Sequence, residues 1–208
     1  SFCTFEVDDN NNIFGSYNTS VSTNITTLNT FQPNFISEYD INNNLISNGF
    51  VFKLNNQGQL QWATYNGLLG TGDIVLNNNE LIVNAIRSDI LPQYNSLYCT
   101  QPNCEMQNTT QVISKFDCVT GQRTFSKYMP ENEFAAAQMT TDGVNIYTLS
   151  IIANNAVTSQ NAYQPIHGGS IDLYLAKFDA IFQRQWGTFI GGNTQEDLGA
   201  ALNSTFFY

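Results

Sequence analysis

The amino-acid sequence predicts an all-β chain built from repeated antiparallel sheets. A short apolar strand with a central lysine occurs three times, and each lysine follows the previous one at 62 residues. The three strands lie at residues 50–55, 112–117 and 174–179. An aromatic residue follows each lysine after nine or ten positions, as Trp62, Phe125 and Trp186. A fixed period of this length indicates a repeat architecture.

The composition indicates a chain with a substantial core and an uncharged polar surface. Of 208 residues, 42% are hydrophobic and 12% charged, the latter about half the usual share. Solubility rests instead on 28 Asn and 34 Ser or Thr. The net charge is −10 and the seven basic residues are scattered, which disfavours nucleic acid as a partner. This balance favours an extracellular or cell-surface protein.

The two ends of the sequence suggest a piece of a longer protein, truncated at both sides. Residues 1–5 start as if within a strand, without a basic segment or an apolar leader. Residues 203–208 end without a tail or linker. No apolar run approaches the ~18 residues of a membrane span.

In the first repeat, turn residues separate four apolar segments. Strands are expected at residues 3–8, 13–17, 50–55 and 60–65. Asp and Asn at residues 9–12 join the first two strands as a hairpin, and a polar insertion at residues 18–48 precedes the lysine strand.

The second and third repeats follow the same order, with insertions at residues 87–109 and 153–170. Strands are expected at 73–76, 80–86, 112–117 and 122–128, then at 134–140, 144–152, 174–179 and 183–190. A further segment, 196–202, is expected to begin a fourth repeat.

Four strands per repeat at this period predict the blades of a β-propeller. Three four-stranded antiparallel blades, about 1–67, 71–130 and 133–192, are expected, with the start of a fourth at 196–208. Small residues such as Ala135–Ala137 suit an innermost strand, and the lysine strands are apolar on both faces, as in a packed sheet. Because propellers close with about four to eight blades, the remainder of the chain or a partner must cover the open edges.

The lysine of each repeat is expected to mark a position rather than a site. Its predicted place at the end of a strand suggests a side chain that extends its ammonium group to solvent over an apolar stem.

Three segments of the third repeat resemble the bacterial SBBP β-propeller repeat, of the general form DAFVAKLD…G…WSTYLGG…DDxG. They are Asp172–Asp179, Gln185–Gly192 and Glu196–Gly199. Tyr163–Pro165 is similar to the AFQ segment of that repeat, whereas the middle repeat departs from it, with Phe125 in place of Trp and Met129-Pro130 in place of Gly-Gly. The resemblance implies a large secreted or surface-anchored bacterial protein, often adhesin-like. It implies no catalytic residues.

Four cysteines allow three pairings. Cys99 and Cys104 enclose a turn-prone Thr-Gln-Pro-Asn spacer, which favours a small disulfide-closed loop over free thiols. A metal site is disfavoured because the chain has one histidine and no paired CxxC. Cys3 and Cys118 are left to pair with each other or with residues outside this sequence.

Two acidic pairs are the candidate ligand-face residues. Glu131 with Glu133 and Glu196 with Asp197 lie on loops that enter a new blade, at the face where propeller ligands dock. They could contact a ligand or form a glycosidase-like acid and base, but carboxylates that cap backbone N–H groups at the blade junction explain them more simply.

Calcium is the cofactor that the sequence raises. Asp8–Asn12 matches part of the spacing of a calcium loop, but the glycine and the final glutamate of that motif are missing, so a plain hairpin turn is favoured. His167 has no recognisable nucleophile beside it.

These observations predict a non-catalytic extracellular module of a larger surface protein, without a cofactor, for adhesion or for binding protein or glycan. One alternative is a structural or assembly component completed by a partner chain. Another is a hydrolase on a propeller scaffold that uses the face carboxylates.

Overall fold

The computed structural model describes residues 4–40, 42–87, 99, 111–130, 136–152, 156–169 and 172–193. The chain divides into two compact units, residues 1–129 and 130–208. Every regular element in the described ranges is a β-strand, and none is a helix.

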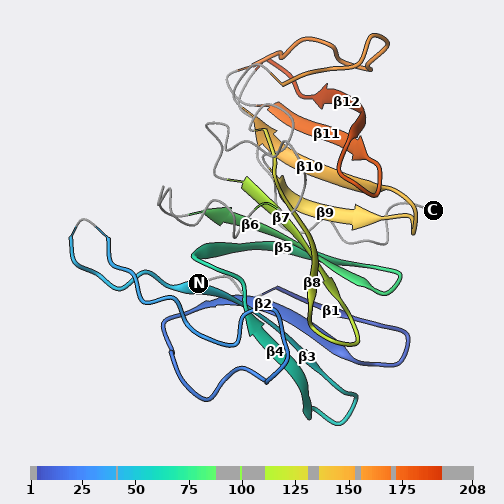
Figure 1. Cartoon of the computed structure of the whole chain (residues 1–208). Helices are drawn as coiled ribbons and strands as arrows, with labels where there is room; N and C mark the ends of the chain where they lie inside the picture. The colour runs from blue at the N-terminus through green and yellow to red at the C-terminus, as the bar shows by residue number, and fades with distance from the viewer. Residues whose placement is uncertain are drawn as a thin grey trace. The chain divides into compact units, whose positions relative to one another are not determined.

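The first unit contains two four-stranded antiparallel sheets (Figure 1). The first sheet consists of β1 (Thr4–Val7), β2 (Ile13–Thr19), β3 (Asn48–Leu54) and β4 (Leu60–Tyr65), in that order. The second consists of β5 (Leu69–Asn77), β6 (Glu80–Arg87), β7 (Gln111–Asp117) and β8 (Arg123–Tyr128). In both, each strand pairs with the next along the chain.

The second unit contains one sheet of the same topology. Its strands are β9 (Ala136–Thr141), β10 (Ile146–Ile152), β11 (Asp172–Phe178) and β12 (Arg184–Ile190). The prediction of an all-β chain of antiparallel sheets is therefore confirmed for the described residues.

Most expected strand limits agree with the structure within two residues. The largest difference is β5, which begins at Leu69 rather than Asp73. The segment 196–202 and Ala135 lie outside the described residues.

The lysine and the aromatic residue that follows it nine or ten positions later are cross-strand partners in each sheet. Lys53 pairs with Trp62, Lys115 with Phe125 and Lys177 with Trp186. In all three sheets the register shifts immediately after the lysine. Because cross-strand partners lie on the same face, each sheet presents its lysine and aromatic side chain together, and the β-bulge beside them bends the strand and increases its twist.

Asx turns close the hairpins. Asp8 Oδ1 accepts hydrogen bonds from the backbone N–H groups of Asn10 at 2.9 Å and Asn12 at 2.8 Å. Asn55 makes the same pair of bonds to Gln57 and Gln59. Because Asp8 Oδ2 also accepts from the Asn12 amide at 2.8 Å, the geometry at Asp8–Asn12 is that of the plain hairpin turn favoured above.

An apolar core joins the two sheets of the first unit. Phe14, Val51 and Trp62 extend from the first sheet and are at most 3% exposed. They pack against five buried residues of the second sheet, which are Ile74, Leu81, Val83, Phe116 and Cys118. The sheets are thus stacked face to face, with side chains interdigitated between them.

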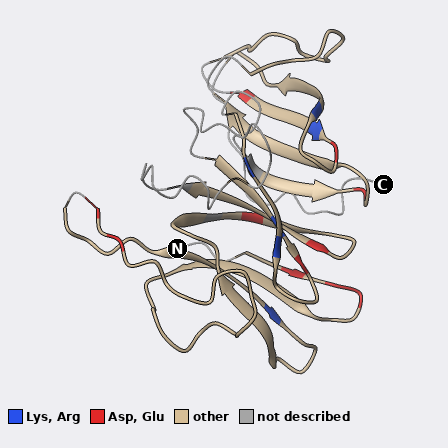
Figure 2. Ribbon diagram, in the orientation of Figure 1, with Lys and Arg blue, Asp and Glu red and all other residues tan. Residues whose placement is uncertain are grey.

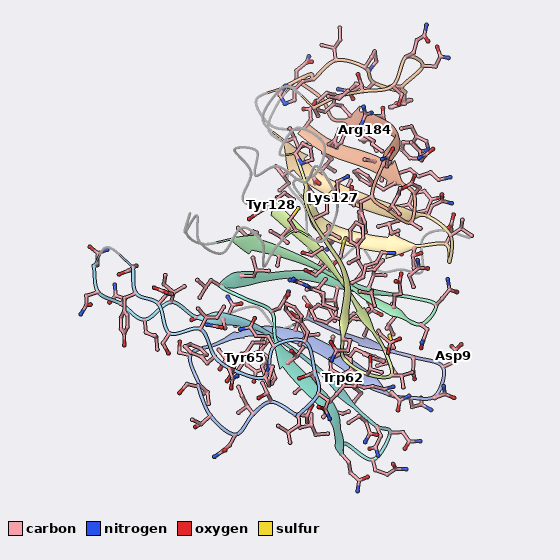
Figure 3. All side chains as sticks on the ribbon, viewed as in Figure 1. Asp9, Trp62, Tyr65, Lys127, Tyr128 and Arg184 are labelled. Atoms are coloured by element: carbon pink, nitrogen blue, oxygen red, sulfur yellow. The ribbon has the colours of Figure 1, made fainter. Side chains whose placement is uncertain are left out.

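A single backbone carbonyl fixes the register of this stack. The carbonyl oxygen of Cys118, in the β7–β8 turn, accepts Lys53 Nζ at 3.0 Å and Trp62 Nε1 at 3.1 Å (Trp62 is labelled in Figure 3). Both donors come from the first sheet. The aromatic ring is therefore buried without leaving its N–H group unpaired.

The expectation that the lysines extend to solvent is wrong for the first two repeats. Lys53 bonds the neighbouring sheet, as above. The side chain of Lys115 is 7% exposed and forms an ion pair of 2.6 Å with Glu80 on the adjacent strand. The lysine sits beside the bulge rather than at a free strand end, so its ammonium group meets acceptors inside the protein.

Gly121 provides a test of the stack. Its φ is +69°, and a Cβ there would lie 2.8 Å from the Trp62 ring, whereas Gly58, with φ +75°, has nothing within 4 Å of such an atom. Gly58→Ala should cost about 1 kcal/mol of unfolding free energy, from backbone strain alone. Gly121→Ala should cost about 2 kcal/mol more, because the ring must also move. Urea denaturation measures both, and equal losses would contradict the described packing.

The Lys115–Glu80 pair provides a second test. Glu80→Gln should lower the unfolding free energy by ~2 kcal/mol, because it leaves a desolvated ammonium without its counter-charge. The double change Glu80→Gln with Lys115→Met should recover most of this loss, since it removes the unpaired charge as well. The comparison is a thermal or urea melt of the three proteins, and a double variant less stable than Glu80→Gln would refute the interpretation.

Candidate functional site

The acidic residues singled out by sequence, Glu131, Glu133, Glu196 and Asp197, lie outside the described residues, so their roles stay predictions. Cys104 does as well, and the Cys99–Cys104 disulfide is therefore also untested. Cys99 packs against a buried cluster of the second sheet, made of Leu69, Ala85, Val112 and Tyr128.

The described parts of the insertions carry a repeated structure that sequence reasoning did not identify. In the first repeat, the side-chain carbonyl of Gln32 accepts the N–H of Gly67 at 2.8 Å, and its backbone carbonyl accepts the N–H of Tyr65 at 3.0 Å. In the third repeat, Gln164 accepts the N–H groups of Gly191 and Phe189, each at 3.0 Å. The shared Phe/Tyr-Gln-Pro tripeptide is the sequence signal that could have predicted this.

The segments around these glutamines form a strap, defined as residues 26–33 in the first repeat and 158–165 in the third. Thr27 N–H bonds the carbonyl of Ala63 at 2.9 Å, and Ser159 N–H bonds that of Gly187 at 3.0 Å. The straps therefore follow β4 and β12, the outermost strands of their sheets. An edge strand covered in this way cannot pair with a foreign strand.

His167 takes part in the same arrangement. Its Nε2 lies 3.2 Å from the carbonyl oxygen of Ile152, and its ring packs edge-on against Phe189 with centroids 5.3 Å apart. These contacts give the histidine a structural role in the third repeat.

The first insertion is longer than the third by a segment that builds a hollow. The strap glutamine and its partner at the start of the lysine strand are 16 residues apart in the first repeat, Gln32 and Asn48, but 8 residues apart in the third, Gln164 and Asp172. The additional residues form a small hairpin in which Tyr39 pairs with Leu45, and Ile46 N–H bonds the carbonyl of Glu38 at 2.8 Å.

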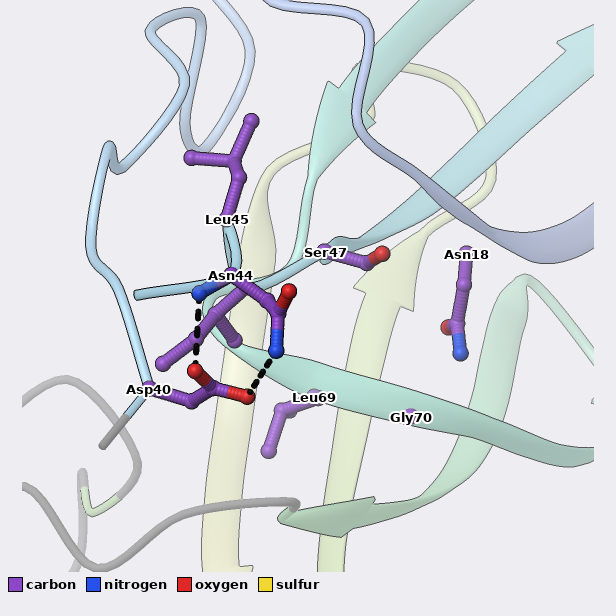
Figure 4. A pocket seen from close by; sticks show the side chains of 8 residues that line it. Asn18, Asp40, Asn44, Leu45, Ser47, Leu69 and Gly70 are labelled. Atoms are coloured by element: carbon purple, nitrogen blue, oxygen red, sulfur yellow. Dashed lines mark hydrogen bonds between the residues drawn. The ribbon is translucent and has the colours of Figure 1, made fainter. Parts of the chain in front are cut away.

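This hairpin, residues 38–46, lines one side of a hollow of about 260 Å³ on the first unit (Figure 4). Asn18 near the end of β2, Ser47 immediately before β3 and the start of β5 complete the wall. The lining combines polar and apolar residues, which are Asn18, Asp40, Asn44, Leu45, Ile46, Ser47, Leu69 and Gly70.

Hydrogen bonds within the turn fix Asp40. Its Oδ1 accepts the N–H groups of Asn42 and Asn44, both at 2.8 Å, and its Oδ2 accepts the Asn44 amide at 3.0 Å. The bond from the Asn44 side chain, with those from the backbone, lowers the pKa of the Asp40 carboxyl. Asp40 is therefore ionised at neutral pH. The hairpin also carries Glu38 and has no basic residue (Figure 2).

The chemistry of the hollow is that of hydrogen bonding to a small polar molecule. Asn18, Asn44 and Ser47 have groups that can donate and accept, and Asp40 adds acceptor oxygens. The lining holds no serine or cysteine beside a histidine and no second carboxylate, so it lacks the paired groups of nucleophilic or acid–base catalysis.

Two further searches cover the described residues. They contain no group of three or more His, Cys, Asp or Glu side chains arranged to hold a metal ion. They also contain no helix of sufficient length and apolar character to cross a membrane.

Comparison with known proteins does not assign the chain to a family. No family model matches the chain, and no curated protein is significantly similar to it.

Cys118 is a free, buried thiol, so it does not pair with Cys3. Burial raises the pKa of this thiol to about 12. Since the thiolate is the reactive form, Cys118 should alkylate at least ~100-fold more slowly in the native protein than in urea near pH 8. Mass spectrometry of iodoacetamide-treated protein, site by site, measures this. Rapid native labelling of Cys118 would show that the turn opens readily.

Proposed function

We propose that this chain is a non-catalytic, extracellular β-propeller module of a larger surface protein, and that it binds a glycan. The proposal of a propeller is supported by three sheets of identical strand order, each with a bulge after its lysine. It is also supported by the face-to-face stacking of the first two sheets. The similarity of the third repeat to SBBP sequences agrees with it and favours a bacterial surface protein.

The hollow beside Asp40 is the observation that carries the binding role. Amide, hydroxyl and carboxylate groups converge there within a volume that suits one or two sugar rings. Sugar hydroxyls both donate and accept hydrogen bonds, and this mixed lining can satisfy both. Leu45, which is 38% exposed, offers apolar surface in the lining.

Charge selects the class of glycan. The chain carries a net charge of −10, and the ionised Asp40 carboxylate lines the hollow. An anionic ligand such as a sialylated or phosphorylated glycan would be repelled. A neutral oligosaccharide is therefore the expected ligand.

The test is an array of neutral and sialylated oligosaccharides, followed by calorimetry with the best neutral binder. Asp40→Asn should weaken binding at least tenfold, about 1.4 kcal/mol, because a neutral amide is a poorer acceptor for sugar hydroxyls. The turn itself should survive, since Asn55 closes an identical turn with an amide.

Asp8→Asn is the matched control. Asp8 makes the same three bonds as Asp40, to Asn10 and twice to Asn12, but does not line the hollow. It changes the net charge equally and should leave the affinity unaltered. Equal losses in both variants, or the absence of any neutral glycan among the binders, would contradict the proposed site.

A further inference from the structure

The sequence contains two Asn-Gly dipeptides, Asn48-Gly49 and Asn66-Gly67, and both lie in the first repeat. In such a dipeptide the backbone nitrogen of the glycine can attack the side-chain amide carbon of the asparagine, because glycine has no Cβ to hinder the approach. The reaction needs a free glycine N–H group and an asparagine side chain that can turn toward it. The hydrogen bonds around the two dipeptides therefore decide whether either can react.

Asn48-Gly49 is held at both reacting groups. Asn48 Oδ1 accepts the backbone N–H of Ile36 at 3.0 Å, and Asn48 Nδ2 donates to the Ile36 carbonyl at 3.0 Å. The Gly49 N–H group donates to the carbonyl of Gly67 at 2.9 Å. These bonds fix both the attacking nitrogen and the amide that it would attack.

Asn66-Gly67 depends instead on the strap of the first repeat. The Gly67 N–H group donates to Gln32 Oε1 at 2.8 Å, so the strap glutamine holds the attacking nitrogen. Asn66 is 1% exposed, and its Oδ1 has no hydrogen-bond partner in the part of the chain that the structure describes. The Asn66 amide is thus held less firmly than that of Asn48. The bond to Gln32 is therefore what keeps this dipeptide from reacting.

We infer that Asn66-Gly67 is a site of spontaneous deamidation that the strap keeps closed. When the strap opens, the Gly67 nitrogen forms a bond to Asn66 Cγ, and the bond from Cγ to Nδ2 breaks. The proton of the former N–H group leaves with Nδ2 as ammonia, and a five-membered succinimide ring remains. One water molecule then opens either C–N bond of that ring, adding its hydroxyl group to the carbonyl carbon and its proton to the nitrogen. The product has aspartate or isoaspartate at position 66, without any change of oxidation state.

The product cannot restore the closed strap. A carboxylate in place of Asn66 would be a charge at a position that is 1% exposed, and an unpaired buried charge is strongly disfavoured. Isoaspartate also lengthens the main chain by one methylene group, which displaces the Gly67 N–H group from Gln32. Each opening that leads to reaction is therefore permanent. The inference does not rest on glycan binding, because none of these residues lines the hollow beside Asp40.

The third repeat has the same strap bond without the same chemistry. Gln164 Oε1 accepts the N–H of Gly191 at 3.0 Å, the counterpart of the bond to Gly67. The residue before Gly191 is Ile190, which has no amide to attack. Gln164→Leu is therefore a matched control for Gln32→Leu, since both remove a strap acceptor and only the latter removes it beside an asparagine.

Peptide mapping by mass spectrometry tests the inference, with the folded proteins incubated at mildly alkaline pH. Deamidation at Asn66 should be about tenfold faster in Gln32→Leu than in the wild type, since the loss of the strap bonds makes opening more frequent. Asn48 in the same protein should keep the wild-type rate, because its bonds to Ile36 remain. Gln164→Leu should leave both rates unchanged. Equal rates at Asn66 in Gln32→Leu and the wild type, or a joint rise at Asn48 and Asn66, overturn the inference.

The wild type alone gives a test that needs no folded variant. Circular dichroism in increasing urea locates the global unfolding transition. At urea concentrations below that transition, Asn66 should already deamidate faster than in buffer, while Asn48 stays slow, because the strap opens before the sheet unfolds. Acceleration of both sites only at the global transition would show that the strap does not open by itself, and would overturn the inference.

Asn66→Asp tests whether the change is permanent. This variant carries the product side chain and should have a Tm about 5 °C below that of the wild type, because the closed strap buries the new carboxylate. Asn56→Asp changes the net charge equally at an exposed turn position and should leave the Tm unaltered. An unchanged Tm in Asn66→Asp would show that the closed strap accepts the product, so the opening would not be permanent.

Discussion

The bond of one turn carbonyl to two donors is the constraint on which the first unit depends. Two apolar sheets can slide against each other, because apolar contact has little directional preference. The Cys118 carbonyl removes that freedom by accepting both Lys53 Nζ and Trp62 Nε1. It can do so because Lys53 and Trp62 are direct cross-strand partners and so lie side by side on one face. The contact that buries the Trp62 ring therefore also provides an acceptor for its N–H group.

The same constraint explains why the lysine and its aromatic partner make different contacts in the three repeated sheets. Lys115 has no need of a neighbouring carbonyl, because Glu80 on its own sheet neutralises it. Its cross-strand partner is Phe125, which has no N–H group to satisfy. The third sheet returns to Trp and Lys, and its face is only partly buried.

The strands and turns could be predicted because they depend on residues close together in the sequence. The partners of Lys53 and Gln32 could not, because those contacts join residues far apart in the sequence. Strand limits followed from alternating apolar residues, and turns from Asp and Asn whose side chains bond backbone two and four residues on. The prediction for Lys53 was wrong because its acceptor is a backbone carbonyl 65 residues away. Every residue type has such a carbonyl, so the sequence does not indicate which one accepts the bond. Likewise the tripeptide around Gln32 recurs in the third repeat, but its partner Gly67 is 35 residues distant, so the tripeptide does not show what the glutamine binds. The acidic pairs chosen as ligand contacts remain predictions.

The strap explains how an insertion can carry a binding surface without weakening its sheet. Gln32 and Asn48 fix the two ends of the added segment to β3, β4 and the turn after β4. Residues between those ends can then change in number, because the entropy of closing a loop grows slowly with its length. The equivalent positions are 8 residues apart in the third repeat and 16 residues apart in the first. Asp8 and Asp40 close the same turn, yet only Asp40 stands on such a segment beside a hollow. Position relative to the strap, more than the local motif, therefore separates a structural turn from a candidate site.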